Sequence, residues 1–461
     1  MTTAGNTVFS PMGGPPPLGG DVPGPPTLTL KMARKITAIS TSGTIVEYFD
    51  LSLASFMGAT VWPALFFPKG SFAAAFAASV GVAVGVTYAA RPIGAMLFGH
   101  FGDRLGRKNS LISTLILGAF GTLMLAFAPS YAGAGMWGIG MVLVARFIFG
   151  IAMGGQMGSA VSWITEAAEA TGTKRRGLFT GMMAPAASIG VTLCAGLFLL
   201  FSQVLSKAAF ASWGWRVVVL VGVLVIVIAG AAMVSVVDSP IFTNVKQKKE
   251  IRTFPLGDVI KEQWRKLLIL PFISVGVTMV TLLSSLFVAG YLESQHVAWF
   301  SYTAIYFMSF IGGFFMIAGG LISATYSDRL GRKKTVIIGL IMALVMGIIG
   351  VQFLVETKTW AGSLIAIIFF SIPVAVGEGG FYALFAEAFP TRYRQTASGL
   401  TYQLSNFWEA IILICIVPTA YVAFGIGGSV WVLVGLVVLC AGLGIGAAIW
   451  TRETAGVPLE L

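Results

Sequence analysis

About twelve apolar runs, each long enough to cross a bilayer, follow one another along this chain of 461 residues. A membrane-spanning helix needs about 20 apolar residues, whereas a barrel strand needs about 10. Because every amide must be hydrogen-bonded within the hydrocarbon, runs of this length predict helices and exclude open sheets. The runs fall near residues 37–62, 73–101, 109–128, 138–165, 177–205, 214–237, 266–292, 298–326, 334–354, 361–389, 395–423 and 428–450.

Composition indicates the same class of protein. Apolar residues make up 57% of the chain and charged residues only 10%, which does not describe a water-soluble surface. We therefore expect an all-α, multi-pass protein of the cytoplasmic membrane. His100 and His296 are isolated, and the three cysteines lack metal-ligand spacing, so we expect no metal and no cofactor.

The distribution of Lys and Arg predicts the orientation of the chain. With the N-terminus in the cytoplasm, most cations gather on that side, at 31–35, 104–108, 174–176, 246–266, 329–334, 392–394 and 452. The cations left outside are Lys69, Lys207, Arg216 and Lys358. The positive-inside rule therefore places both termini in the cytoplasm. Topology and contact with anionic membrane lipids explain the net charge of +11, so we expect no nucleic-acid partner.

A charged turn occurs twice in the chain. GHFGDRLGRK at Gly99–Lys108 is answered 225 positions later by SDRLGRKK at Ser327–Lys334. The glycine pair 154–155 corresponds to the pair 379–380 at the same offset. Two matches at one offset predict two six-helix halves, related by an axis along the membrane normal, with a site between them.

The chain divides into five segments. We expect the protein to be a monomer. They are a flexible cytoplasmic tail at 1–35, an N-terminal six-helix bundle at 36–237, a cytoplasmic central loop at 238–264, a C-terminal six-helix bundle at 265–450 and a cytoplasmic tail at 451–461.

The repeated turn is suited to a lock between the halves. Asp103 and Asp328 are expected at helix ends, where they can meet arginines and backbone amides, while Gly106 and Gly331 permit a tight turn. Breaking such pairs as the halves rock alternates access to the site, whereas a purely topological cationic turn is the alternative. The gating candidates are Gly99, Asp103, Arg104, Gly106, Arg107, Glu166, Asp328, Arg329, Gly331, Arg332, Glu387 and Arg392.

Several segments resemble one group of transporters. SGTIVEYFD at Ser42–Asp50, ARPIGAMLFGHFGDRLGRK at Ala90–Lys108 and RFIFGIAMGG at Arg146–Gly155 resemble the major facilitator superfamily. DSPIF at Asp238–Phe242 and AEAFPTRYR at Ala386–Arg394 add to the likeness. Within the superfamily, the chain is similar to the metabolite:proton symporter family of α-ketoglutarate, proline-betaine and shikimate permeases. The resemblance implies two six-helix bundles, a solute site near the midplane and inward transport of a small organic solute with protons.

Three positions depart from the pattern of that family, and at one of them Phe149 replaces the glutamine before the fourth-helix glycine. The family carries Gly-Gly-Glu in the fourth helix, where this chain has Gln156, so that protonatable group is absent. Ala324 stands where the first turn has Gly99, and we expect the helix contact there to be reshaped.

Six charged residues lie inside the predicted helices, where an unpaired charge costs about 2.5 to 3.5 kcal/mol. Glu47 and Asp50 share a helix face, and one of them is expected to take a proton whose release is coupled to solute movement. Alternatively, either carboxylate pairs with Arg91 or Arg146 and only holds helices together. Arg146 fits a structural role and a coupling role equally well. The candidates for proton coupling are Glu47, Asp50, Arg146, Glu378 and Glu409.

Arg91 is the preferred anchor for an anionic group of the solute, because its planar guanidinium stays charged. Four membrane acids against two arginines nevertheless favour a zwitterionic, cationic or neutral solute. Ordinary helix packing explains any single aromatic side chain in these helices equally well. The further binding candidates are Tyr88, Gln156, Tyr291, Tyr382, Tyr402, Gln403, Asn406 and Trp408.

Together these features predict a secondary transporter for an organic acid, amino acid or betaine-like solute, driven by protons. Inward movement of one positive charge gains about 2.3 kcal/mol per 100 mV, so no nucleotide is needed. The chain has neither a phosphate-binding loop nor a catalytic triad pattern, so we expect no enzyme. Sugar uptake and drug efflux are alternatives, and the tail RETAGVPLEL at Arg452–Leu461 is similar to that of sugar porters. A sensor that binds solute without moving it is the alternative of a different class.

Overall fold

The computed structural model describes residues 28–67, 75, 78–79, 81–235, 255–282 and 287–459. Residues 1–27 of the predicted tail, Lys69 and the DSPIF motif at 238–242 lie outside the described residues. So does residue range 238–254 of the predicted central loop. The rest of that loop is helical, because α13 (Pro255–Ile269) begins before the seventh apolar run.

The helices follow the predicted apolar runs. The N-terminal half contains α1 (Leu30–Thr60), α2 (Trp62–Leu65), η1 (Gly81–Gly85), α4 (Val86–Leu105), α5 (Arg107–Ala126), α6 (Tyr131–Ala134), α7 (Met136–Glu169), α8 (Arg176–Gly181), α9 (Met183–Val204), α10 (Lys207–Ala209), η2 (Phe210–Gly214) and α11 (Trp215–Val234). The C-terminal half contains α13, α14 (Pro271–Leu282), α15 (Val288–Ser294), α16 (Tyr302–Leu330), α17 (Arg332–Thr357), α18 (Trp360–Glu387), η4 (Thr391–Tyr393), α19 (Arg394–Ile411), η5 (Ile412–Ile416), α20 (Val417–Gly428) and α21 (Val430–Trp450).

Nine helical segments within the described ranges are long and apolar enough to span a membrane. The three other predicted spans correspond to α1, to η1 with α4, and to α14 with α15. Trp137, Val422 and Trp431 are 85%, 74% and 75% exposed, as expected for side chains that face lipid rather than water. The predicted all-α membrane fold is confirmed.

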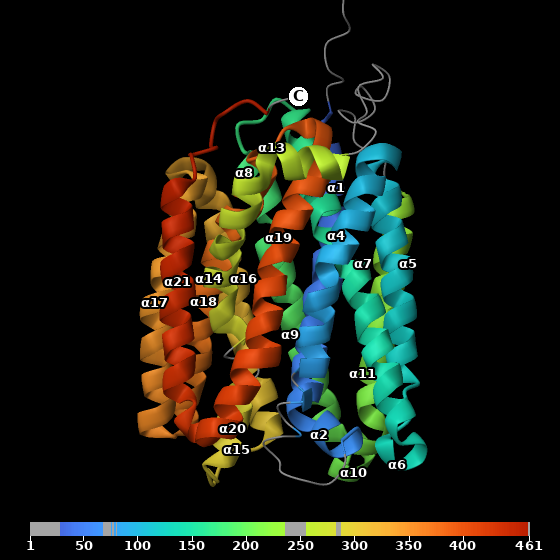
Figure 1. Ribbon diagram of the computed structural model, residues 1–461, viewed down its shortest axis with the longest axis vertical. Coiled ribbons are helices and arrows are strands. Elements are labelled where there is room, and N and C mark those ends of the chain that lie inside the picture. The colour runs from blue at the N-terminus through green and yellow to red at the C-terminus, as the bar shows by residue number, and fades with distance from the viewer. Residues whose placement is uncertain are drawn as a thin grey trace, which may run out of the picture.

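The helices of both halves run along the long axis of the molecule, with α13 lying across one end (Figure 1). The C-terminus lies at this same end, which we call the motif end because it carries the two repeated turns. Gly106 and Gly331 form these turns with φ values of 115° and 94°, a conformation that L side chains rarely adopt. Each glycine therefore ends one helix and starts the next with a sharp change of direction.

The glycines matched between the halves hold equivalent helix crossings. A Cβ on Gly154 in α7 would lie 2.8 Å from Cα of Gly94 in α4. A Cβ on Gly379 in α18 would lie 2.7 Å from Cβ of Ser323 in α16. The sequence repeat thus records the same close packing of α7 on α4 and of α18 on α16.

Ala324 changes which helix supplies the small residue at the motif end. A Cβ on Gly99 in α4 would lie 2.9 Å from Cα of Thr396 in α19. At the second turn the glycine is Gly181 of α8 in the N-terminal half, and a Cβ on it would lie 2.9 Å from Cα of Ala324. The contact is reshaped as expected. The two helices still approach closely, because the residue without a Cβ is now Gly181 of α8 rather than a residue of α16.

Candidate functional site

At the motif end, the aspartate of the first turn reaches the other half of the molecule. Oδ2 of Asp103 accepts hydrogen bonds from the backbone N–H and the hydroxyl of Thr396, at 2.9 and 2.6 Å. Thr396 lies in the first turn of α19, where N–H groups have no partner within the helix. Oδ1 of Asp103 pairs with Arg107 at 2.7 Å. Behind it, Glu166 accepts from Arg107 at 3.2 Å and lies 3.6 Å from Arg394 of the opposite half.

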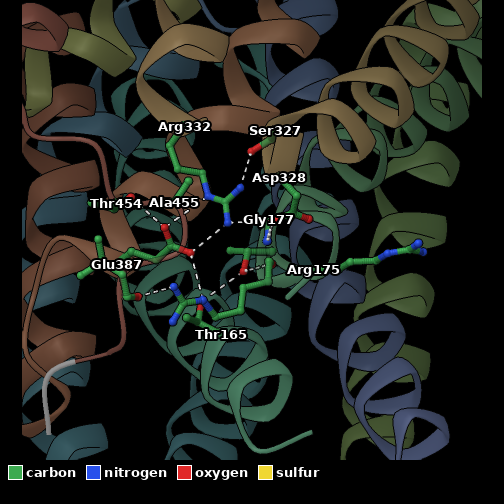
Figure 2. Close-up of polar contacts among 12 residues, drawn as sticks. Thr165, Arg175, Gly177, Ser327, Asp328, Arg332, Glu387, Thr454 and Ala455 are labelled. Carbon is green, nitrogen blue, oxygen red and sulfur yellow. Dashed lines mark hydrogen bonds and ion pairs between the residues drawn. The ribbon is translucent and has the colours of Figure 1, made fainter. Parts of the chain in front are cut away.

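The second turn makes the matching contact in the opposite direction (Figure 2). Oδ1 of Asp328 accepts from the N–H of Gly177 at 2.9 Å, and Oδ2 accepts from the N–H of Leu178 at 2.8 Å. Both donors belong to α8, at the start of the helical segment that continues into α9. Arg332 pairs with Asp328 at 2.9 Å and is 1% exposed. Each aspartate therefore satisfies unpaired N–H groups of a helix in the other half and lies at the positive end of its dipole.

Glu387 links the second turn to both halves (Figure 2). Its carboxylate accepts from Arg332 at 3.2 Å and lies 3.5 Å from Nε of Arg176 in the N-terminal half. The hydroxyl of Thr454, in the C-terminal tail, donates to Glu387 at 2.7 Å. Glu387 thus occupies the position that Glu166 has in the first half, with the tail as an additional partner.

The C-terminal tail makes two further contacts at the motif end. Glu453 accepts hydrogen bonds from the backbone N–H groups of Arg332 and Lys333, at 2.9 and 3.2 Å, and so caps α17. Nη2 of Arg176 donates to the backbone oxygen of Val457 at 2.5 Å. We call the contacts of Asp103 with α19 the first lock and those of Asp328 with α8 the second lock. Among the residues that the structure describes, the tail contacts only the second lock in this way.

Three arginines among the gating candidates lie outside these contacts. Arg104 and Arg329 are exposed, and Arg329 lies over the ring of Tyr326. Arg392 pairs with Glu262 of α13 at 2.7 Å, near the surface. The contacts between the halves therefore use the buried arginine of each turn, whereas the second arginine of each turn is exposed.

Near the middle of α1, both acids pair with an arginine of their own half. Arg91 in α4 donates to Glu47, and Nη1 of Arg146 in α7 donates to both oxygens of Asp50 at 2.9 and 2.7 Å. All four side chains are buried. This is the arrangement of the alternative in which the acids hold helices together, and a proton-coupling role for Glu47 or Asp50 stays a prediction.

Glu378 in α18 forms no ion pair with any residue that the structure describes. Its Oε1 accepts from the hydroxyl of Tyr48 in α1 at 2.5 Å, and its Oε2 is buried without a partner. The hydroxyls of Tyr382 and Tyr402 lie 3.1 and 3.3 Å from that of Tyr48. The bond between Tyr48 and Glu378 therefore joins the two halves in the interior of the bundle.

Glu409 in α19 is a second buried acid without an ion pair within the described ranges. Its Oε1 accepts from the hydroxyl of Thr278 in α14, and its Oε2 makes no hydrogen bond to any residue that the structure describes. Both residues belong to the C-terminal half. Tyr88 and Arg91 both belong to α4 in the N-terminal half, and the ring centroid of Tyr88 lies 4.6 Å from the guanidinium of Arg91.

The amide side chains among the binding candidates are buried. Gln403 donates to the backbone oxygen of Met153 at 3.3 Å, and Asn406 donates to Gln403 at 2.6 Å. Gln156 packs against Gly43, and neither of its amide atoms has a hydrogen-bond partner in the described structure. These polar groups could serve a solute from several directions.

Two binding candidates lie away from this interior cluster. Trp408 is 42% exposed and stacks on Phe272 with ring centroids 5.9 Å apart. Tyr291 lies in α15 beside Phe287, at the end opposite the motif end. A role for Trp408 and Tyr291 in solute binding stays a prediction. No group of three His, Cys, Asp or Glu suited to a metal occurs among the described residues.

Neutral contacts join the halves at the end opposite the motif end. The hydroxyl of Tyr306 lies 3.2 Å from that of Thr60, and the hydroxyl of Thr303 lies 3.2 Å from that of Ser202. A cavity of 470 Å³ lies beside them and is lined by residues of both halves, including Phe210. The structure is thus locked by ionic contacts at one end and by hydroxyl groups at the other.

Comparisons with known proteins agree with this arrangement. A family model described as the Major Facilitator Superfamily matches residues 48–412. An inner membrane metabolite transport protein, YhjE, of Escherichia coli K12 is 28% identical over 437 residues, covering 91% of this chain and 94% of that protein. The shikimate transporter of the same organism is 26% identical and covers 82% of this chain and 86% of its own length.

Two further comparisons concern proton symporters. A citrate-proton symporter of Klebsiella pneumoniae is 25% identical, covering 79% of this chain and 80% of that protein. The solved structure of a proton:xylose symporter, XylE, superposes with a TM-score of 0.71 at 20% identity, covering 93% of this chain and 98% of the other. The structural likeness shows the shared fold of two helical bundles.

Proposed function

Since this chain belongs to the major facilitator superfamily of membrane transporters, we propose that it carries a small organic solute together with protons. The solute is an organic acid, an amino acid or a betaine-like metabolite. Similar proteins named as citrate-proton symporter and shikimate transporter support this class, as does the interior polar cluster. The protein is a secondary transporter that works by alternating access and is not an enzyme.

We place the motif end and both termini in the cytoplasm, with the chain acting as a monomer in contact with anionic lipids. The exposed Arg104 and Arg329 lie at this end, where the positive-inside rule puts cations. For the N-terminal bundle, the central segment and the C-terminal bundle, this proposal retains the bounds that the sequence predicts. Labelling of single cysteines introduced at positions 104 and 358, from either side of the membrane, tests this orientation.

The proton-coupling proposal depends on one observation: two buried acids in the interior have no ion pair within the described structure, whereas Glu47 and Asp50 each have an arginine. A bare carboxylate inside a membrane is costly, so it is expected to be neutralised by a proton or a cation. Glu409 and Glu378 each accept one hydrogen bond from a hydroxyl, but the hydroxyl of Tyr48 that donates to Glu378 lies 3.1 and 3.3 Å from the hydroxyls of Tyr382 and Tyr402. We therefore assign the proton to Glu409.

Uptake into proteoliposomes, with the pH gradient and the voltage imposed independently, tests the proposal. We expect solute accumulation to follow an inward proton gradient in the native protein. Glu409→Gln should keep solute exchange between the two sides but lose pH-driven accumulation. Glu356→Gln, at an exposed position of α17, is the matched control and should keep both activities.

Three outcomes separate the parts of the proposal. Solute binding without flux in the native protein rejects transport. Flux that ignores the pH gradient in the native protein rejects proton coupling. Full pH-driven accumulation by Glu409→Gln rejects only the assignment of the proton to Glu409.

A further inference from the structure

The buried charges inside the bundle do not balance. Arg91 and Arg146 are each paired with an acid of α1, whereas Glu378 and Glu409 form no ion pair within the described ranges. With all six groups ionised, the cluster carries an excess of two negative charges. A proton on Glu409 removes one of them, and the remaining charge lies on Glu378.

The hydrogen bond that Glu378 accepts favours its ionised form. The hydroxyl of Tyr48 donates to it at 2.5 Å, and the hydroxyls of Tyr382 and Tyr402 extend this network. Hydrogen bonds from hydroxyl groups to a carboxylate stabilise its charge. Oε2 of Glu378 is fully buried and makes no hydrogen bond to any described group, so it can accept one from a ligand.

Aromatic residues lie beside the hydroxyl network of this acid. The rings of Tyr382 and Tyr402 have centroids 6.1 Å apart and are inclined at 49°. The ring centroid of Phe381 lies 4.6 Å from that of Tyr382 and 6.1 Å from that of Tyr402. Aromatic faces inclined to one another beside a carboxylate recognise ammonium groups by cation–π attraction. The cluster thus combines two independent features that attract a positive charge.

The two arginines are poorly placed to take an anionic solute. A carboxylate that binds Arg91 must displace Glu47, and one that binds Arg146 must displace both oxygens of Asp50. Either exchange leaves a further buried acid without its cation. A solute with two or three negative charges therefore worsens the imbalance in the cluster.

We propose that the solute carries one positively charged nitrogen, held by Glu378 and by the rings of Tyr48, Tyr382 and Tyr402. This inference rests on the proposed transport function and adds the charge class of its solute. Tyr48 belongs to the N-terminal half and the other three residues to the C-terminal half. Binding of the nitrogen between them draws the halves together and so favours the closed form of the interior.

The test uses the purified full chain and two sets of probes. Glycine betaine, choline and proline represent solutes with one positive nitrogen, and citrate, α-ketoglutarate and shikimate represent anions. We expect only the first set to raise the temperature of thermal unfolding in detergent and to compete with one another for uptake. Glu378→Gln should weaken binding at least about tenfold, because it removes the charge that pairs with the nitrogen.

Substitutions of one tyrosine separate the ring from the hydroxyl. Tyr382→Phe keeps the ring and should keep most of the affinity, whereas Tyr382→Leu removes it and should weaken binding roughly 3- to 30-fold. Glu356→Gln again serves as the control for the Glu→Gln change and should bind like the native protein. A merely structural role for Tyr382 predicts equal losses in the Phe and Leu variants.

The outcomes distinguish this inference from the transport proposal. Accumulation of citrate, α-ketoglutarate or shikimate, without binding of any nitrogen-bearing probe, overturns the inference and leaves transport intact. Binding of a nitrogen-bearing probe without flux supports the inference and rejects transport. Binding that is equal in Glu378→Gln and in the native protein also overturns the inference, as does a first set in which no probe binds.

Discussion

The backbone N–H of Thr396 donates to the carboxylate of Asp103 across 2.9 Å, and the two residues belong to opposite halves of the molecule. Asp328 makes the corresponding contact with Gly177 at the same distance. A carboxylate at the start of a helix interacts with unpaired N–H groups and with the positive end of the dipole. The contacts that close the motif end are therefore built on two aspartates, each supported by the buried arginine of its own turn.

Asp103→Asn should open the motif end. The change removes the charge that binds Thr396 and Arg107, and charged hydrogen bonds contribute about 1.5 to 3 kcal/mol each. We expect the ratio of closed to open forms to fall roughly tenfold or more. Distances between spin labels attached at Lys174 and Lys334, in the two halves, measure this ratio.

Arg104→Gln is the control for that experiment, because Arg104 is exposed in the same turn. Its distance distribution should match that of the native protein, and Arg107→Gln should resemble Asp103→Asn. If the variants at positions 103 and 104 have the same distribution, the repeated turn is topological and does not gate.

Gly158→Ala should separate the halves at the crossing of α7 and α19. A Cβ there would lie 2.5 Å from the backbone oxygen of Gln395 and 2.8 Å from Cα of Gly399, and backbone atoms cannot move aside cheaply. We expect the open form to gain at the motif end, with a lower unfolding temperature. Gly399→Ala should have a smaller effect, since its Cβ meets Cα of Gly158 at 3.2 Å.

Gly442→Ala provides the background for these two glycine variants. No atom of the described structure lies within 4 Å of a Cβ at this position, so the substitution tests helix propensity alone. A shift in Gly442→Ala as large as that in Gly158→Ala contradicts the steric explanation.

Glu47→Gln should destabilise the protein by about 3 to 5 kcal/mol, because it leaves Arg91 buried without its acid. The double variant Glu47→Gln, Arg91→Gln should regain a large part of this loss, since neither charge remains. Unfolding temperatures of the purified variants in detergent provide the comparison. A double variant less stable than both single variants would show that the pair does more than neutralise charge.

Ending the chain at Arg452 should weaken the second lock and leave the first intact. The truncation removes the cap that Glu453 provides for α17 and the contacts of Thr454 and Val457. Loss of a cap costs about 1 kcal/mol, and the charged bond from Arg176 adds to this. Cysteine accessibility at the motif end should rise in the truncated protein and rise less in Glu453→Gln, which keeps the tail.

The helices could be predicted from the sequence because each apolar run reports its own span. The lock could be predicted only in part: the spacing placed Asp103 at a helix end, but its partner Thr396 is supplied by packing between the halves. The sequence also could not separate Arg107 from Arg104, since burial decides which of the two cations pairs with the acid.

The contacts in the interior were harder to predict, because they depend on which side chains face one another and not only on which residue types are present. The sequence predicted that Glu47 and Asp50 share one face of α1. The structure shows that each of them forms an ion pair with an arginine. The role of Tyr48 could not be predicted, because a neutral hydroxyl in an apolar helix does not indicate its partner. Only the structure shows that Glu378 of the other half lies 2.5 Å from this hydroxyl. The surplus of acids was visible in the sequence, whereas the two acids without ion pairs were not.

The contribution of the tail to the second lock implies an order of assembly during synthesis. Arg176 is translated long before Glu387, and Val457 follows both in the chain. The nascent chain can complete the contact of Asp103 with Thr396 before Val457 has been made. The second lock can form all its contacts only after Val457 has been made, so the first lock can close earlier than the second.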